Sequence, residues 1–216
     1  MMLPKPLLRG WFHAGAAVAA VLLTLAFCWR SRNDAPRLLS LLIFGLSMIE
    51  LYTVSAIYHI GNWRARADRT LQRLDHANIP FLIAGTYTPI CFNVLTDWAR
   101  LAFLTVVWAL AGGGIVLAFY AGRVPRGLRT GLYIGMGWVA VLGLPLFWTR
   151  LPPLAIVLLV AGGLLNTVGA LIYARQRPNP FPRVLGFHEL FHLCVVAGGT
   201  AFATMIWIWV VPFPRV

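Results

Sequence analysis

Residues 101–120 of the chain are LAFLTVVWALAGGGIVLAFY, a run without a charged side chain. An α-helix rises about 1.5 Å per residue, so about 20 apolar residues cross the roughly 30 Å hydrocarbon core of a bilayer. Backbone polar groups in lipid must satisfy one another, and the run lacks the alternating pattern of a barrel strand. We therefore expect a transmembrane helix here.

Six more blocks have the same character. The predicted spans are residues 11–29, 38–60, 74–95, 101–120, 128–148, 151–173 and 185–211. The longest connectors, around residues 61–73 and 174–184, are only as long as ordinary loops, so little chain remains for a soluble domain. The sequence predicts an all-α polytopic membrane protein, with residues 1–216 forming one seven-transmembrane-helix bundle.

The overall composition agrees with this class. The 216 residues are 60% apolar and only 11% charged, and the mean hydropathy of +0.78 excludes a soluble domain with a polar exterior. A net charge of +12 would suggest nucleic acid in a soluble chain, but here the arginines lie between apolar blocks and can contact lipid headgroups. We expect the bilayer as partner and no nucleic acid. Cys28, Cys91 and Cys194 lie in separate blocks, which favours neither a disulfide framework nor a thiolate metal site.

The distribution of Lys and Arg predicts the orientation. One side of the predicted topology holds twelve: Lys5, Arg9, Arg64, Arg66, Arg69, Arg73, Arg123, Arg126, Arg129, Arg175, Arg177 and Arg183. The other side holds six: Arg30, Arg32, Arg37, Arg100, Arg150 and Arg215. By the positive-inside rule the N-terminus is cytoplasmic and the C-terminus is outside.

Polar residues gather at the cytoplasmic end of three spans. His59 ends the second span one turn after Ser55, Asp75 and His76 begin the third, and H-E-x-x-H (residues 188–192) begins the seventh. Histidines four residues apart share one helix face and can bind one metal ion. We expect His59, His188 and His192 to be three ligands of Zn²⁺, with a fourth position open to water.

We expect the polar residues next to these ligands to act on groups bound to the ion. Asp75 would take a proton from the bound water, and Ser55 would orient a ligand or steady a developing oxyanion. His76 lies about 100° from Asp75 around the helix, so we place it beside the ligands and not among them. Glu189 is either a general base or a partner of Arg183 or water at the rim, and we favour the second.

Other polar residues have structural interpretations. Glu50 lies near the middle of the second span, about 180° around the helix from His59; we expect a protonated carboxyl paired with a residue such as Asn166, a proton relay as alternative, and a charged lipid-facing group least of all. We expect His13 and the tryptophans Trp11, Trp29, Trp63, Trp148 and Trp209 at the membrane interfaces.

In three of its motifs the chain resembles the hemolysin III family, the bacterial branch of the progestin and adipoQ receptor family. The resemblance rests on residues 55–59 (SAIYH), residues 74–78 (LDHAN) with 85–89 (GTYTP), and residues 186–192 (GFHELFH). It spans nearly the whole chain. The residues 11–15 (WFHAG) match the family's usual His-Gly opening only loosely, and a histidine usual near the end of many relatives is absent from residues 201–203.

The resemblance implies a heptahelical bundle that holds zinc near the cytoplasmic leaflet through His59, His188 and His192, with Asp75 contacting the zinc-bound water. The family is also similar to alkaline ceramidases, which implies hydrolysis of a membrane-lipid amide or ester. Its bacterial members are linked by name to haemolysis and by resemblance to membrane-lipid homeostasis, which implies a bacterial inner-membrane location.

Three alternatives to a lipid hydrolase stay open. A non-catalytic heptahelical sensor would use the zinc structurally. An intramembrane metalloprotease would also use H-E-x-x-H, but usually adds an Asp in a Leu-Asp-Gly context that residues 74–76 (LDH) lack. A pore-forming haemolysin would need polar groups along a continuous path across the bilayer. The sequence specifies neither the lipid nor the oligomeric state.

Overall fold

The computed structural model describes residues 6–120 and 124–214, and within them the regular structure is helical. The elements are α1 (Trp11–Arg30), α2 (Ala35–Ile60), α3 (Ala65–Val94), α4 (Asp97–Phe119), α5 (Arg126–Gly137), α6 (Ala140–Trp148), α7 (Pro153–Arg175), α8 (Phe187–Met205) and a π-helical turn (Ile206–Val210). Lys5, Arg123 and Arg215, which entered the prediction of orientation, lie outside the described residues.

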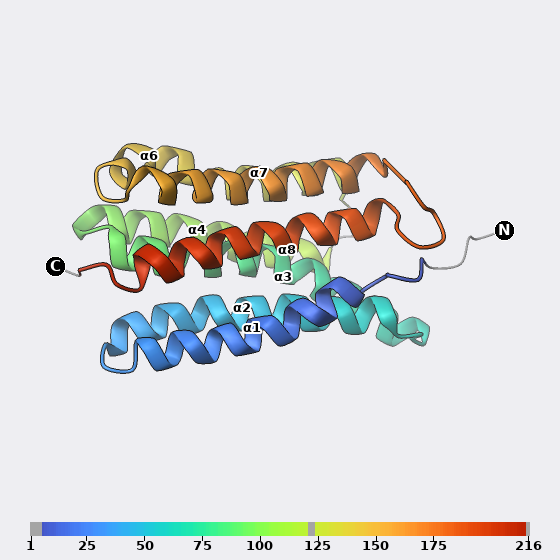
Figure 1. Cartoon of the computed structure of the whole chain (residues 1–216). Helices are drawn as coiled ribbons and strands as arrows, with labels where there is room; N and C mark the ends of the chain where they lie inside the picture. The colour runs from blue at the N-terminus through green and yellow to red at the C-terminus, as the bar shows by residue number, and fades with distance from the viewer. Residues whose placement is uncertain (1–5, 121–123, 215–216) are drawn as a thin grey trace.

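These elements form the predicted membrane bundle. Six helical segments are long and apolar enough to cross a bilayer: α1, α2, α4, residues 126–148, α7, and α8 with its π-turn. The seventh segment is α3, whose low mean hydropathy reflects its charged first turns. The helices run alongside one another, and the start of α1 and the end of the π-helical turn lie at opposite ends of the bundle, as an odd number of crossings requires (Figure 1). The chain is thus a multi-pass, heptahelical membrane protein.

Two segments depart most from the predicted boundaries. The helix α3 begins at Ala65, not near residue 74, because residues 65–73 form polar helical turns ahead of the apolar part. The fifth span is divided into α5 and α6. The hydroxyl of Tyr87 donates to the carbonyl of Gly137 at 2.7 Å and accepts from the N–H of Ala140 at 2.6 Å. A side-chain hydroxyl inserted between a carbonyl and an amide in this way interrupts the helical ladder.

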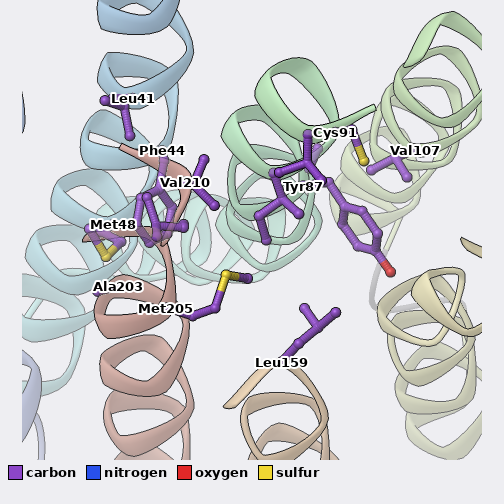
Figure 2. Close-up of a cluster of buried hydrophobic side chains, with 14 of the residues drawn as sticks. Leu41, Phe44, Met48, Tyr87, Cys91, Val107, Leu159, Ala203, Met205 and Val210 are labelled. Atoms are coloured by element: carbon purple, nitrogen blue, oxygen red, sulfur yellow. The ribbon is translucent and has the colours of Figure 1, made fainter. Parts of the chain in front are cut away.

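Away from the end of the bundle that carries His59, His188 and His192, the interior is packed mainly with apolar side chains. Phe44 and Met48 of α2 lie beside Ala203 and Val210 of the last span (Figure 2). Phe44 and Val210 are completely buried. At the other end of these two spans, α2 carries His59 and α8 carries His188 and His192.

The helices α7 and α8 are held close by glycine. A Cβ atom added to Gly162 would lie 2.6 Å from the ring of Phe202, and one added to Gly169 would lie 2.7 Å from the Cβ of Cys194. Without a driving force from water, helices in lipid associate by such close packing of small residues. A Cβ added to Gly163, on the same helix, would have no neighbour within 4 Å.

We therefore expect Gly169→Ala to lower the free energy of unfolding by about 1–3 kcal/mol, because its methyl group would overpack a contact between two rigid Cβ positions. Gly163→Ala is the matched control and should be neutral or slightly stabilising. Unfolding in mixed micelles with increasing SDS, followed by tryptophan fluorescence, measures both. Equal stability of the two variants would show that Gly169 does not set the helix spacing.

Candidate metal centre

Three histidine side chains from two helices meet at one end of the bundle. His59 lies in the last turn of α2, and His188 and His192 lie on one face in the first turns of α8. One nitrogen from each ring belongs to a group whose atoms all lie within 4.8 Å of one another. The Nε2 atoms of His59 and His188 are 3.1 Å apart. The structure thus brings together the three residues that the spacing of the sequence singled out.

The arrangement is compatible with a shared metal ion. Two nitrogens bound to one tetrahedral zinc at about 2.0–2.1 Å would lie about 3.3 Å from each other. His59 and His192 are 7% and 1% exposed. Neutral imidazole nitrogens carry lone pairs that bind divalent ions, so these three residues can hold one.

Asp75 lies beside this group. Its Oδ2 atom is 3.7 Å from Nε2 of His59, and its side chain is 15% exposed. Ser55, one turn before His59 on α2, is almost fully buried and is a hydrogen-bonding neighbour of the Asp75 carboxylate. The carboxylate is therefore adjacent to the group of three histidines but does not belong to it.

His76 occupies a different position from its neighbour Asp75. It lines the same cavity but does not belong to the group of three ring nitrogens. Its carbonyl accepts from the hydroxyl of Tyr133 on α5 at 3.3 Å, and its Nδ1 is buried without a partner among the described residues. Its role beside the ligands stays a prediction.

Glu189 was expected to pair with Arg183 or water at the rim, and this is wrong. Its side chain is fully buried, and its partner is Arg9, whose Nε contacts Oε1. The other oxygen accepts from the backbone N–H of Gly186 at 2.7 Å, which completes a capping interaction at the start of α8. Both carboxylate oxygens are thus engaged in holding the N-terminal segment and the helix end together.

The same N-terminal segment is fastened by its backbone. The N–H of Leu7 donates to the carbonyl of Arg183 at 3.0 Å, and that of Leu8 donates to Val184 at 3.3 Å. Residues 6–10 therefore cross over the chain just before α8. The first turn of the helix that carries His188 and His192 is held in place from outside by this crossing.

His13 was expected at the membrane interface, and this too is wrong. It is 2% exposed and stacks on His192, with ring centroids 3.8 Å apart and planes within 7° of parallel. Neither of its ring nitrogens has a partner among the described residues. The missed signal was depth, because α1 begins at the same end of the bundle as α3 and α8, so a histidine in its first turn lies level with the other polar residues.

The site opens into a cavity of about 610 Å³. Its walls come from α1–α3 and α5–α8, and they are mostly aliphatic and aromatic, with Asp68, Gln72 and Tyr58 at the end of the bundle where α3 begins. Pockets for small molecules commonly measure about 300–1,000 Å³. The histidine group therefore lies beside a space that can accept an apolar chain.

Arg129 adds a positive charge to this cavity. The sequence assigned Arg129 only to orientation, but in the structure it is 8% exposed in the first turn of α5 and lines the cavity. No carboxylate within residues 6–120 or 124–214 forms an ion pair with it. Burial of a guanidinium without a counter-charge is unfavourable, so the cavity wall favours a ligand with negative or strongly polar groups.

A model of the haemolysin-III related family matches residues 1–203. The chain belongs to this family.

Individual relatives agree with the family match. The chain is 33% identical over 178 residues to the hemolysin-3 homolog of Bacillus subtilis (strain 168), which covers 82% of the chain and 80% of the relative. It is 29% identical over 202 residues to hemolysin-3 of Bacillus cereus, with 93% and 89% covered. It is also 24% identical over 201 residues to the human monocyte to macrophage differentiation factor, with 90% and 80% covered.

If the three histidines bind one ion, this haemolysin-III related protein should lose stoichiometric metal when His188 and His192 are both replaced by Ala. His76→Ala is the matched control, because it removes an imidazole from the same cavity but not from the group of three. Metal per protein is measured by plasma mass spectrometry after purification in detergent. Full metal content in the double variant would rule the site out.

The stack of His13 on His192 predicts a second effect on metal affinity. His13→Ala should weaken binding by roughly tenfold, the lower end of what groups that orient metal ligands contribute. His13→Phe keeps an aromatic ring against His192 and should stay within about threefold of the unaltered protein. Competition with a fluorescent zinc chelator gives the dissociation constants. Comparable loss in both variants would indicate that a ring nitrogen of His13, and not its stacking, is what matters.

Proposed function

We propose that this protein is a zinc-dependent hydrolase that cleaves an amide or ester bond of a membrane lipid at the cytoplasmic leaflet. The observation that carries the proposal is the position of Asp75, 3.7 Å from His59, next to three converging histidine nitrogens at the wall of an apolar cavity. A purely structural metal site does not require a carboxylate and a ligand-sized cavity on the same side.

The donor set suits zinc. Three neutral imidazoles without a thiolate are a common protein set for catalytic zinc, which keeps one position open. When bound, the ion supplies a Lewis acid that makes a water molecule nucleophilic near neutral pH and polarises a carbonyl oxygen.

The protein residues then perform the proton transfers. Asp75 accepts a proton at a carboxylate oxygen from the attacking water, while the water oxygen forms a bond to the carbonyl carbon. The C–N or C–O bond of the substrate breaks, and Asp75 passes the proton to the leaving nitrogen or oxygen. Ser55 holds the carboxylate by a hydrogen bond, and Arg129 offsets negative charge on the headgroup or on the acid that is released.

In this proposal, the cavity determines which lipids the protein binds. An acyl chain lies among the aliphatic and aromatic walls, and the polar headgroup stays near the cytoplasmic end with Tyr58, Asp68 and Gln72. Exclusion of bulk water by these walls strengthens the electrostatic interactions around the scissile bond.

A second candidate is a non-catalytic heptahelical sensor with structural metal. The same three histidines join the end of α2 to the start of α8, and such a link stabilises a bundle without turnover. Intramembrane proteolysis has less support, because Glu189 of H-E-x-x-H is engaged by Arg9 and Gly186 and is not free to act as base. Pore formation has no comparable support, because the polar groups gather at one end of the bundle.

Asp75→Asn separates the first two candidates. In a hydrolase it should lower kcat by at least about 100-fold, the effect expected from loss of a general base, with zinc content unchanged. The measurement is release of fatty acid, by mass spectrometry, from synthetic N-acyl sphingoid lipids and acyl esters in nanodiscs. Asp97→Asn is the control, because Asp97 is exposed at the start of α4, at the other end of the bundle.

Two results would contradict the hydrolase. One is turnover by Asp75→Asn equal to that of the unaltered protein. The other is stoichiometric zinc in the unaltered protein with no cleavage of any amide or ester lipid, which would favour the sensor.

A further inference from the structure

One acidic side chain lies on the outer face of the bundle at mid-membrane depth. Glu50 is exposed and lies 10 residues before the end of α2 at Ile60, which is about 15 Å along the helix axis. In a hydrocarbon core of roughly 30 Å this is near the middle, too far for the carboxylate to reach headgroups. Within residues 6–120 and 124–214 no group forms a hydrogen bond or ion pair with its carboxylate, and the amide of Asn78 donates to its backbone carbonyl at 3.4 Å.

The structure corrects the expectation for this residue. Asn166, the suggested partner, donates instead to the carbonyl of Gly162 in its own helix. Glu50 also faces away from the cavity, because nine residues, or about 180°, separate it from His59. It is exposed on the outer face of the bundle, where a charged carboxylate was the least expected arrangement. An acidic group in that position has a large desolvation penalty unless something outside this chain satisfies it.

The residues around Glu50 form a regular stripe along α2. Leu39, Ile43, Leu46, Glu50, Thr53 and Ile57 follow one another at spacings of four and three residues. Leu39, Leu46 and Ile57 are 61%, 54% and 44% exposed, and Ile43 and Thr53 are partly exposed. A repeat of 3.5 residues is the spacing at which two helices interlock side chains along a seam. We call these six residues the α2 seam.

We propose that the α2 seam is a homodimer interface, in which α2 of one protomer packs in parallel against α2 of a second copy with Glu50 at its centre. All copies insert into the membrane with the same orientation, so a two-fold axis that relates two of them lies along the membrane normal. Residues close to such an axis meet their own counterparts. Each Glu50 therefore faces the Glu50 of the second copy.

The chemistry of the seam favours a second copy over other occupants. A carboxylic acid carries both a donor and an acceptor, so two of them form reciprocal hydrogen bonds, and the Thr53 hydroxyl one turn away adds a further polar group. Interhelical hydrogen bonds of this kind promote association within lipid. Leucine and isoleucine on either side of Glu50 supply the packing, and the carboxyl groups leave the hydrocarbon when the seam is covered.

Cysteine cross-linking tests the geometry. Cys28, Cys91 and Cys194 are first replaced by Ser or Ala, and Leu46→Cys, Ile57→Cys and Leu164→Cys are made one at a time. Leu164 is the matched control, because it is 49% exposed on α7. After oxidation in native membranes, the Leu46 and Ile57 variants should form disulfide-linked dimers of twice the monomer mass, and the Leu164 variant should not. Equal cross-linking at Leu164, none on α2, or a cross-link to a different protein overturns the proposal.

Substitution of Glu50 tests the chemistry. Both E50L and E50Q should fold, because either side chain is tolerated on a lipid-facing stripe, and unchanged metal content verifies this. E50L should weaken dimerisation in bilayers by about five- to thirty-fold, the effect of losing one interhelical hydrogen-bond pair. E50Q keeps a donor and an acceptor and should stay within about threefold. Single-molecule photobleaching in liposomes of graded protein density gives the monomer–dimer equilibrium. A monomer at all densities, or E50L that dimerises like the unaltered protein, overturns the proposal.

Discussion

The convergence of three imidazoles inside an apolar bundle is the constraint around which this protein is organised. Hydrocarbon cannot hydrogen-bond, so polar groups at this depth must face one another, a ligand or a cation. His59, His188 and His192 face one another. Their convergence requires the end of α2 and the start of α8 to lie at one level. The two helices approach closely at Tyr52 and Gly199, where a Cβ atom added to Gly199 would overlap with the Tyr52 hydroxyl.

Other interactions keep those two helix ends in place. The Arg9–Glu189 ion pair and the backbone hydrogen bonds of Leu7 and Leu8 fasten the N-terminal segment across the start of α8. His13 then lies directly on His192. The helix α1 contributes no nitrogen to the group of three histidines, but its His13 packs against the ring of His192 and so restricts the orientation of that ring.

The sequence was sufficient for the membrane class and for the histidine group. Each span is specified by the length of an apolar run, and the depth of a residue follows from its distance from the end of that run. His59, His188 and His192 could therefore be placed at one level without coordinates. The identity of the ion and the roles of Asp75, Ser55 and His76 stay predictions.

What failed were inferences about rotation and neighbours. The sequence shows how deep His13, Glu50 and Arg129 lie but not which residues they contact, because the blocks are apolar on all sides and carry little amphipathic signal. The partner of Glu189 is 180 residues away, and no local pattern indicates it. The division of the fifth span depends on the hydroxyl of a residue in the third.

The hydroxyl of Tyr87 also affects the wall of the cavity. The fifth span is interrupted between α5 and α6. Tyr87 hydrogen-bonds the carbonyl of Gly137 and the amide of Ala140, so the interruption leaves neither of these two backbone groups without a partner in the apolar interior. Trp138, at the interruption, is anchored to Thr167 on α7 at 2.9 Å. The junction of α5 and α6, which forms part of the cavity wall, is therefore held by one hydroxyl from the adjacent helix α3.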